Sequence, residues 1–152
     1  LRIAELIDVT GIFATELFLA DGALVINEVA TRPHNSGHFS MDACATSQFE
    51  NHLRAVLDWP LGPTDMLAPH VVMANLLGED RESLASRMPS AVALPGGVHP
   101  HLYGKEVRPG RKVGHVNAWG ADAEETRARA VRAAALLTGR IPVSALPAGR
   151  TS

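Results

Sequence analysis

The 152 residues allow one domain of ordinary size or two small lobes, and an apolar fraction of 46% is sufficient for a packed core. The formal net charge of −2, without any run rich in lysine and arginine, excludes the electrostatic footprint of a protein that binds nucleic acid or an anionic membrane. No apolar stretch approaches the roughly 18 residues of a membrane span, and no signal peptide is visible. The single cysteine, Cys44, fits a reducing cytosol. A cytoplasmic protein is therefore expected.

Residues 11–30 (GIFATELFLADGALVINEVA) predict a β-hairpin, because two apolar runs flank Asp21-Gly22, the strongest short turn signal. Each run is apolar on both faces, which predicts a sheet that is covered on both sides. Glu16 and Glu28 are therefore conspicuous, since they place charges inside strands that are otherwise apolar.

The register of this hairpin decides what the two glutamates can do. A three-residue loop at 21–23 pairs Glu16 directly with Glu28, whereas a two-residue turn pairs Glu16 with Asn27. In the first register two like charges face each other, which is destabilising unless something bridges them. A divalent cation would do so, since Mg²⁺ typically takes one or two carboxylates plus substrate phosphates. Glutamates that are ion-paired or at a sheet edge are the alternative, which the spacing leaves open.

The segment that follows the hairpin, TRPHNSGH, is dense in polar side chains. Arg32 could bind a planar anion through two parallel hydrogen bonds, and His34, Asn35 and Ser36 offer further donors. A solvated loop, whose path is set by its proline and glycine, is the alternative. The spacing of His34 and His38 is that of two zinc ligands on a helix, but Pro33 and Gly37 argue against a helix there.

Further along the chain, apolar spacing predicts a helix over residues 41–58 with Ser40 as its N-cap. The sequence WPLGPTD (59–65) breaks the pattern and is a candidate lobe boundary. Cys44 falls on the apolar side of this helix and is expected in the core, without a catalytic role.

The second half of the chain predicts smaller elements. Strands are expected over 70–78, 96–105 and 112–120, and a short amphipathic helix at best over 79–88. A capping-box-like pair, Asp122 and Glu125, begins a helix over roughly 123–138, which Gly139 and Pro142 end.

A basic turn, KEVRPGRKVGH, lies between the last two strands. It holds Lys105, Arg108, Arg111 and Lys112, and Gly110 would let the backbone approach a ligand. A binding site for a phosphate monoester and a solvated basic turn are both compatible with this pattern.

Four stretches carry a family resemblance: ELF (16–18), DGALVINEVATRPHNSGH (21–38), SQFENHLRAVLDWPLG (47–62) and KEVRPGRKVGH (105–115). Together they resemble the N5-carboxyaminoimidazole ribonucleotide synthetases, the carboxylating ATP-grasp ligases of purine biosynthesis. The combination of RPHNSGH with RPGRKVGH is highly specific, whereas the glutamate hairpin alone would indicate only an ATP-grasp protein.

The resemblance implies an α+β fold. The C-terminal half of an ATP-grasp domain, an antiparallel sheet with helices, is expected over 1–62. A small β-rich C-terminal domain with a terminal helix is expected over 63–146, and a frayed tail over 147–152. The chain starts at Leu1 with an interior-looking hairpin, and the family's N-terminal domain and ATP-binding lysines have no counterpart in it. We therefore expect the C-terminal part of a longer protein, inactive alone and homodimeric at full length.

The resemblance also implies a reaction, the ATP-dependent carboxylation of 5-aminoimidazole ribonucleotide with bicarbonate through carboxyphosphate. Glu16 and Glu28 are expected to hold Mg²⁺ or Mn²⁺, with Asn27 and Glu28 at the ATP-phosphate end. Arg32 is the expected catalytic arginine, aimed at bicarbonate and carboxyphosphate. The other expected substrate-binding residues are His34, Asn35 and Ser36 in the ribonucleotide pocket, and Lys105 and Arg111 at its 5′-phosphate.

Two other functions stay open at this point. Another ATP-grasp ligase, such as the formate-dependent glycinamide ribonucleotide transformylase, shares the strand glutamate followed by RPH, although the basic turn and NSGH favour the carboxylating family. A non-catalytic module that binds anions or dimerises is the alternative from a different class. ATP turnover by the chain, alone and with the preceding part of the protein, separates these possibilities.

Overall fold

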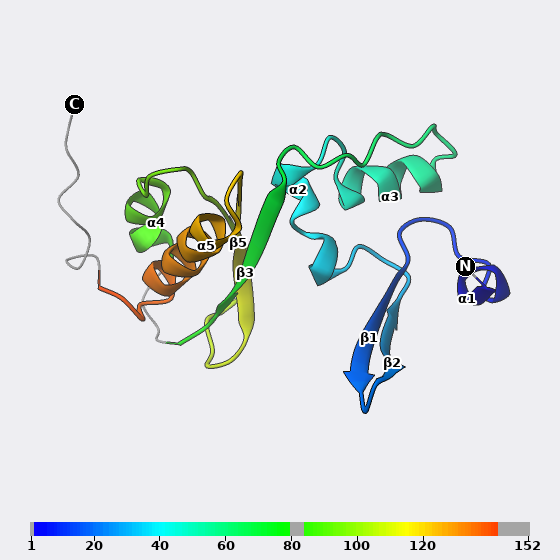
Figure 1. Cartoon of the computed structure of the whole chain (residues 1–152), viewed down its shortest axis with the longest axis horizontal. Coiled ribbons are helices and arrows are strands. Elements are labelled where there is room, and N and C mark those ends of the chain that lie inside the picture. The colour runs from blue at the N-terminus through cyan, green and yellow to red at the C-terminus, as the bar shows by residue number, and fades with distance from the viewer. Residues whose placement is uncertain (1, 80–83, 143–152) are drawn as a thin grey trace. The chain divides into compact units, whose positions relative to one another are not determined.

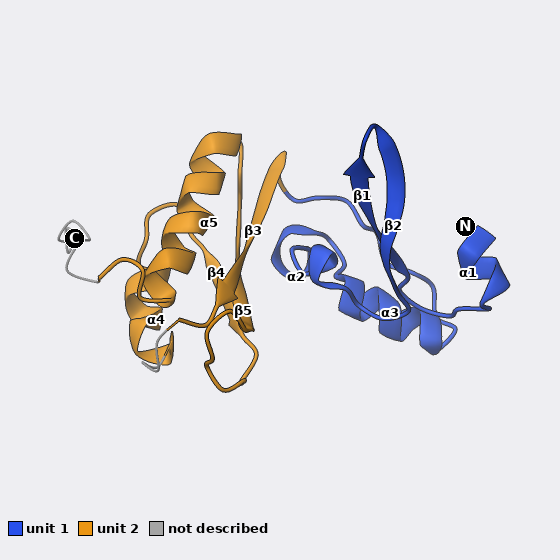
Figure 2. Ribbon diagram, turned by 90° about the horizontal axis from the view of Figure 1, so that it is seen from below, with its two compact units in different colours: residues 1–67 blue, residues 68–152 orange. Residues whose placement is uncertain are grey.

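The chain divides into two compact units, residues 1–67 and residues 68–152 (Figure 2). The structure is a computed structural model, which describes residues 2–79 and 84–142. Helices and antiparallel strands occur in both units, which confirms the predicted α+β class. Within the described ranges, no helix combines the length and the apolar character needed to cross a membrane.

Unit 1 is built around a two-stranded hairpin (Figure 1). Its elements are α1 (Arg2–Leu6), β1 (Ala14–Ala20), β2 (Ala23–Ala30), the 3₁₀ turn η1 (Asn35–Gly37), α2 (Ser40–Ala43) and α3 (Gln48–Val56). The hairpin turns at Asp21 and Gly22, whose φ angles of 50° and 79° suit the type of two-residue turn that matches strand twist. The predicted hairpin is confirmed, and α1 was not predicted.

The expectation that this hairpin is covered on both faces is wrong for the described structure. Leu19 and its partner Leu24 are 75% and 71% exposed, and the next pair, Phe18 and Val25, is 56% and 49% exposed. Two strands alone cannot bury both of their own faces, because each face needs a second layer of structure.

The predicted helix over 41–58 is interrupted. Cys44 ends α2 in an extended conformation and forms an isolated bridge with Met66. The helix resumes at α3, whose N-cap is Ser47, with Oγ accepting from the Glu50 N–H at 3.1 Å. Ser40 is the first residue of α2 and not an N-cap with a side-chain hydrogen bond. Burial raises the pKa of the Cys44 thiol.

The same bridge region explains where unit 1 ends. The predicted boundary followed residue 62, whereas the chain divides after Leu67. The Leu67 N–H donates to the Ala43 carbonyl at 2.8 Å, and the Ala45 N–H donates to the Asp65 carbonyl at 3.0 Å. These hydrogen bonds hold residues 63–67 within unit 1.

Unit 2 is a three-stranded antiparallel sheet in the order β3-β5-β4, with two helices on one face (Figure 1). Its elements are β3 (His70–Leu77), α4 (Leu84–Val92), β4 (His99–Leu102), β5 (Lys112–Gly120) and α5 (Ala123–Leu137). Leu76, Val116 and Leu136 are fully buried in the core between sheet and helices.

Most elements of unit 2 lie where they were predicted. Helix α5 begins at Asp122, which accepts from the Glu125 N–H at 2.8 Å, and ends before Gly139, whose φ is +80°. Helix α4 lies several residues later than the predicted helix over 79–88, part of which falls on residues 80–83, outside the described structure. The predicted tail over 147–152 lies outside it as well.

Candidate active site

A β-bulge places the two glutamates of the hairpin opposite each other. From the turn the strands pair regularly as far as Leu17 and Ile26, and the next pair is Glu16 with Glu28. Asn27 is therefore an extra residue on β2, without a partner of its own on β1. The pairing of Glu16 with Glu28 is that of the first predicted register, but it arises from a two-residue turn and a bulge and not from a three-residue loop.

The side chains around this bulge converge on one histidine. The Nε2 atom of His34 lies 4.0 Å from Glu16 Oε2 and 3.9 Å from Glu28 Oε1. The Asn27 Nδ2 atom donates to Glu16 Oε1 at 2.5 Å. The His34 side chain is only 10% exposed, whereas those of Glu16 and Glu28 are 44% and 48% exposed. The carboxylates therefore share one space that is open to a ligand and bounded by a fixed imidazole.

The hydrogen bonds of His34 define which of its nitrogens carries the proton. The Ser36 N–H can only donate, and it donates to His34 Nδ1 at 3.3 Å. The Ser36 Oγ lies 2.8 Å from the same nitrogen and can donate to it as well. In the neutral ring the proton is therefore on Nε2, which faces the two carboxylates. His34 thus presents a hydrogen-bond donor at the place where anionic groups gather.

The other predicted residues of the loop lie beside this cluster. Arg32 is exposed, with Nη2 at 3.9 Å from Glu28 Oε1 and Nη1 donating to the Pro33 carbonyl at 3.1 Å. Its guanidinium keeps donors available to an anion, since it makes no short hydrogen bond to the carboxylate. Asn35 and Ser36 form the turn η1 directly after His34.

The donor set of the hairpin fits a hard divalent cation. No group of three or more His, Cys, Asp or Glu side chains in residues 2–79 and 84–142 is arranged to hold a metal ion. The hairpin offers two carboxylates. It also offers the amide oxygen of Asn27, because Asn27 binds Glu16 through its amide nitrogen. Such oxygen ligands suit Mg²⁺, which completes its coordination with water and phosphate oxygens.

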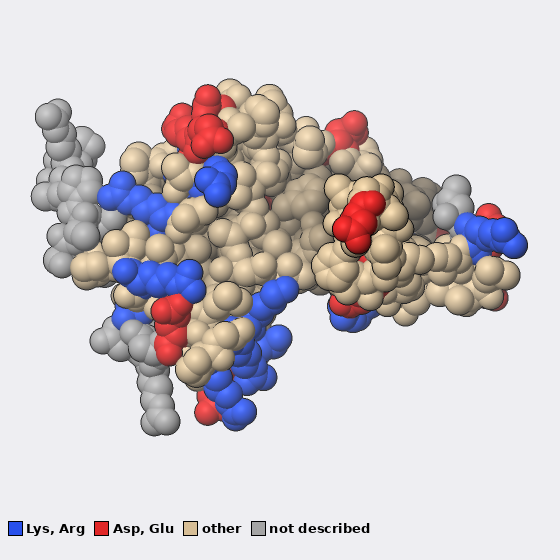
Figure 3. Space-filling model, turned by 60° about the horizontal axis from the view of Figure 1, so that its bottom comes forward, with Lys and Arg blue, Asp and Glu red and all other residues tan. Residues whose placement is uncertain are grey.

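Unit 2 carries the predicted basic turn as an exposed loop between β4 and β5. Blue side chains gather over this loop in Figure 3, with a red carboxylate among them. The Lys105 Nζ lies 5.2 Å from the centre of the Tyr103 ring. Arg108 forms an ion pair with Glu106 at 2.7 Å, whereas Arg111 Nη1 reaches only the Glu106 carbonyl at 3.4 Å. The guanidinium of Arg111 is therefore less engaged than that of Arg108.

The sequence analysis did not identify the residue that supports Lys105. The Tyr103 hydroxyl lies 2.8 Å from Nδ1 of His115, which is 1% exposed on β5. Burial raises the pKa of Tyr103, so its hydroxyl stays neutral through the physiological range. The sequence signal that could have identified Tyr103 was an aromatic residue two positions before Lys105.

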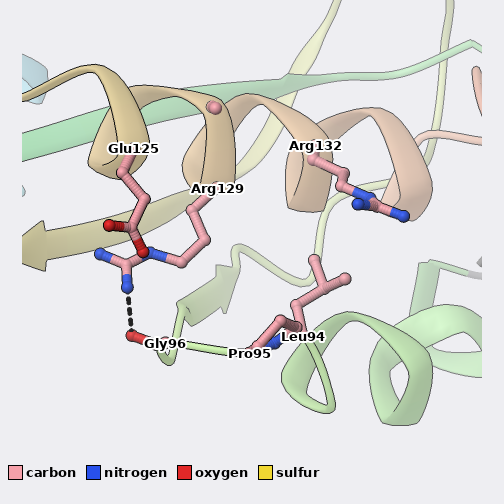
Figure 4. A pocket seen from close by; sticks show the side chains of 7 residues that line it. Leu94, Pro95, Gly96, Glu125, Arg129 and Arg132 are labelled. Carbon is pink, nitrogen blue, oxygen red and sulfur yellow. Dashed lines mark hydrogen bonds between the residues drawn. The ribbon is translucent and has the colours of Figure 1, made fainter. Parts of the chain in front are cut away.

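A separate pocket in unit 2, of about 250 Å³, contains none of the predicted site residues (Figure 4). It is lined by Leu94, Pro95, Gly96, Glu125, Ala128, Arg129 and Arg132. Arg129 donates to the Gly96 carbonyl at 2.7 Å and to the Trp119 carbonyl at 2.9 Å. The Arg129 guanidinium therefore links α5 to the loop at Gly96 and to β5, so its role is structural.

Comparison with known proteins agrees with this arrangement. Family models for the ATP-grasp domain and for the phosphoribosylaminoimidazole carboxylase C-terminal domain match residues 1–49 and 71–129. The N5-carboxyaminoimidazole ribonucleotide synthase of Mycobacterium leprae is 53% identical over 136 residues, covering 80% of this chain and 29% of that protein.

Solved structures give the same result. The phosphoribosylaminoimidazole carboxylase ATPase subunit from Aquifex aeolicus aligns with a TM-score of 0.76 and 43% identity, covering 90% of this chain and 41% of that chain. The N5-carboxyaminoimidazole synthase from Aspergillus clavatus, in complex with ADP and 5-aminoimidazole ribonucleotide, aligns with a TM-score of 0.70 and 32% identity, covering 84% and 35%.

The hairpin with its facing carboxylates, together with the family matches, defines an ATP-grasp protein. The chain belongs to the N5-carboxyaminoimidazole ribonucleotide synthetase family, as the sequence resemblance predicted. It spans about a third of the length of the curated relatives that it matches, from 29% to 37% of each.

Proposed function

We propose that this chain supplies part of the active site of a carbon–nitrogen ligase. The enzyme would use ATP and bicarbonate to carboxylate the amine of 5-aminoimidazole ribonucleotide, giving N5-carboxyaminoimidazole ribonucleotide for purine biosynthesis. The single observation that carries the proposal is the convergence of Glu16 and Glu28 on His34, inside a segment that matches this family.

The hairpin is the phosphate end of the proposed site. Glu16 and Glu28, with Asn27 beside them, would hold Mg²⁺ or Mn²⁺, which neutralises charge on the transferring phosphoryl group. Asn27 holds the Glu16 carboxylate through its amide nitrogen, so the bulge both aligns the two carboxylates and orients one of them.

The loop after β2 is the carboxylation end. Arg32 would orient bicarbonate and carboxyphosphate, because a guanidinium can bind a planar oxyanion through two hydrogen bonds. His34 Nε2–H would donate to the anionic group between Arg32 and the carboxylates. Asn35 and Ser36 would line the ribonucleotide pocket. These residues bind and orient, which lowers the barrier mainly through positioning and electrostatics.

Unit 2 is proposed to bind the 5′-phosphate of the ribonucleotide. Lys105 and Arg111 are exposed, and both belong to the basic loop, whereas Arg108 is already paired with Glu106. The stacking of Lys105 near Tyr103 holds its ammonium group close to the loop. The expected domains, 1–62 for the ATP-grasp part and 63–146 for the C-terminal domain, are proposed with their boundary moved to the division after Leu67. The full-length enzyme would be a cytoplasmic homodimer, without a nucleic-acid or membrane partner.

A substrate matrix tests the proposal against its alternatives. Release of ADP by the full-length protein would be measured with bicarbonate and 5-aminoimidazole ribonucleotide, and separately with formate and glycinamide ribonucleotide. We expect ADP release to require the first pair. Turnover with the second pair would identify the other ATP-grasp ligase, and no turnover with either would leave a binding module. The 152-residue chain by itself is expected to be inactive.

A further inference from the structure

Gln48, the first residue of α3, is bonded to both histidines of the loop after β2. Its Oε1 accepts from the His34 N–H at 3.0 Å, and its Nε2 donates to the His34 carbonyl at 2.8 Å. The same Nε2 lies 2.7 Å from Nδ1 of His38. Gln48 is only 9% exposed, so these hydrogen bonds form away from bulk water.

The orientation of this amide is determined by its partners. A backbone N–H can only donate and a carbonyl can only accept, so Oε1 must face the His34 nitrogen and Nε2 must face the His34 oxygen. His38 Nδ1 is then the acceptor of its contact with Gln48, and the neutral His38 ring carries its proton on Nε2. One amide therefore holds the backbone of His34 and donates to Nδ1 of His38.

The surrounding backbone is arranged to admit this side chain. A Cβ atom at Gly37 would lie 2.5 Å from Gln48 Oε1, so a side chain at position 37 would displace the Gln48 amide from its hydrogen bonds. The Gln48 N–H donates to Ser40 Oγ at 2.9 Å, and that hydroxyl donates to the Gly37 carbonyl at 2.6 Å. Gln48, at the start of α3, thus binds the loop through both its side-chain amide and its backbone N–H.

Helix α3 itself presents polar residues inward. Its buried residues are Gln48 and Asn51, whereas Leu53 and Val56 are 61% and 56% exposed. The Phe49 ring packs against the His38 ring, with centroids 5.3 Å apart, and the other contacts of this helix with the loop are the hydrogen bonds of Gln48. A buried amide that lost its partners would cost the full desolvation of its polar atoms.

We propose that Gln48 is the positioning residue of the active site, which holds His34 Nε2 between the carboxylates of Glu16 and Glu28. This inference rests on the proposed function, since it assigns Gln48 to the reaction at that site. Gln48 contacts no substrate in the proposal and acts only through His34. Its loss should reduce the rate of the chemical step, because small misplacements of a catalytic group cost up to about 10²-fold in rate.

The chain contains a matched control on the same helix. Asn51 is 6% exposed and forms an equivalent pair of hydrogen bonds, accepting from the Gly62 N–H at 2.9 Å and donating to the Gly62 carbonyl at 3.2 Å. Asn51 holds the segment after α3 and forms no hydrogen bond with His34. Gln48→Ala and Asn51→Ala therefore remove the same kind of buried amide clamp from two different segments.

Steady-state kinetics of the full-length enzyme test the proposal. Gln48→Ala should lower kcat for carboxylation about 10–100-fold with the KM for ATP unchanged, whereas Asn51→Ala should lower Tm similarly without that loss of kcat. Gln48→Glu is nearly isosteric and keeps the acceptor but loses the donor, so it should also lower kcat. In a His34→Ala background, Gln48→Ala should cause no further loss. The proposal would be overturned if Gln48→Ala lowered kcat as much in the His34→Ala background as in the wild type. It would also be overturned if Asn51→Ala lowered kcat as much as Gln48→Ala does.

A spectroscopic measurement distinguishes failure of this inference from failure of the proposed function. In ¹⁵N-histidine-labelled protein, neutral His34 and His38 should both show an unprotonated Nδ1 and a protonated Nε2. Gln48→Ala should shift the His38 Nδ1 signal, because this nitrogen loses the Gln48 donor, and should broaden the signals of His34, whatever reaction is catalysed. Unchanged signals would contradict the inference about Gln48. Absence of ribonucleotide-dependent turnover in the wild type, with changed signals, would contradict only the function.

Discussion

Glu16 lies directly opposite Glu28 in the hairpin even though only two residues form the turn between their strands, because Asn27 bulges out of β2. Without the bulge, the regular register would oppose Glu16 to Asn27. The extra residue shifts the pairing by one position, which exchanges the faces of the strand beyond it. The bulge is therefore the structural cause of the paired carboxylates.

The first prediction concerns the charge of this pair. In the full-length enzyme, Glu28→Gln should abolish most ATP hydrolysis and leave binding of 5-aminoimidazole ribonucleotide nearly intact. The carboxylate that it removes is needed at the metal and the transferring phosphate and not at the ribose phosphate. Isothermal titration with the ribonucleotide checks the second half of the prediction. A large loss of that affinity would mean that Glu28 has been assigned to the wrong end of the site.

The second prediction concerns the basic loop of unit 2. Arg111→Ala should raise the KM for the ribonucleotide about 10–100-fold, because a hydrogen bond to a charged group contributes roughly 1.5–3 kcal/mol. The KM for ATP should change little. Arg108→Ala is the matched control, since Arg108 is paired with Glu106, and it should change the ribonucleotide KM by less than about threefold. If Arg111→Ala weakens ATP and spares the ribonucleotide, the loop serves a different phosphate.

The third prediction uses the only tyrosine of the chain. Burial raises the pKa of Tyr103 above its ordinary value of 10.0. The stability that depends on the neutral hydroxyl is therefore fully present below about pH 10, the unfolded pKa, and is lost as pH rises through the folded pKa. Absorbance at 295 nm should titrate above pH 10.0 in the native 152-residue chain and close to it in urea. Tyr103→Phe should remove this transition, and a native midpoint at or below 10.0 would contradict the prediction.

The fourth prediction concerns the N-cap of α5. Asp122→Ala should destabilise unit 2 by about 1 kcal/mol, because it leaves the Glu125 N–H without its acceptor. Asp122→Asn should be close to neutral, since an amide oxygen also accepts at an N-cap. Urea denaturation in a Trp59→Phe background, followed by the fluorescence of Trp119, reports on unit 2. Equal losses for both variants would show that the charge matters and not the cap.

Local signals in the sequence were sufficient wherever one element determines its own boundaries. Helix α5 has a capping residue and a terminal glycine, and strand β5 carries valine and tryptophan residues directly after the turn-rich KEVRPGRK, so both were predicted closely. The capping signal of Ser47 and Glu50 was missed because the apolar spacing across 41–58 continued through the break.

The structure of the candidate site depended on features that propensity does not encode. The bulge at Asn27 arises from pairing between two strands, and the clamp by Gln48 joins residues fourteen positions apart. The inward polar face of α3 has the reverse pattern of an ordinary surface helix, so hydrophobic spacing gave no indication of it. The residues of the site were predicted from a family resemblance, and the geometry that joins them came from the structure.

The most direct test of the central claim follows the carboxyl carbon itself. The full-length enzyme would be incubated with ¹³C-bicarbonate, ATP and 5-aminoimidazole ribonucleotide, and the product observed by ¹³C NMR. A carbamate signal should appear only when all three are present, in step with ADP, and should be absent with Glu28→Gln. Formation of ADP without a ¹³C-labelled ribonucleotide would contradict the assignment of this chain to the carboxylation of 5-aminoimidazole ribonucleotide.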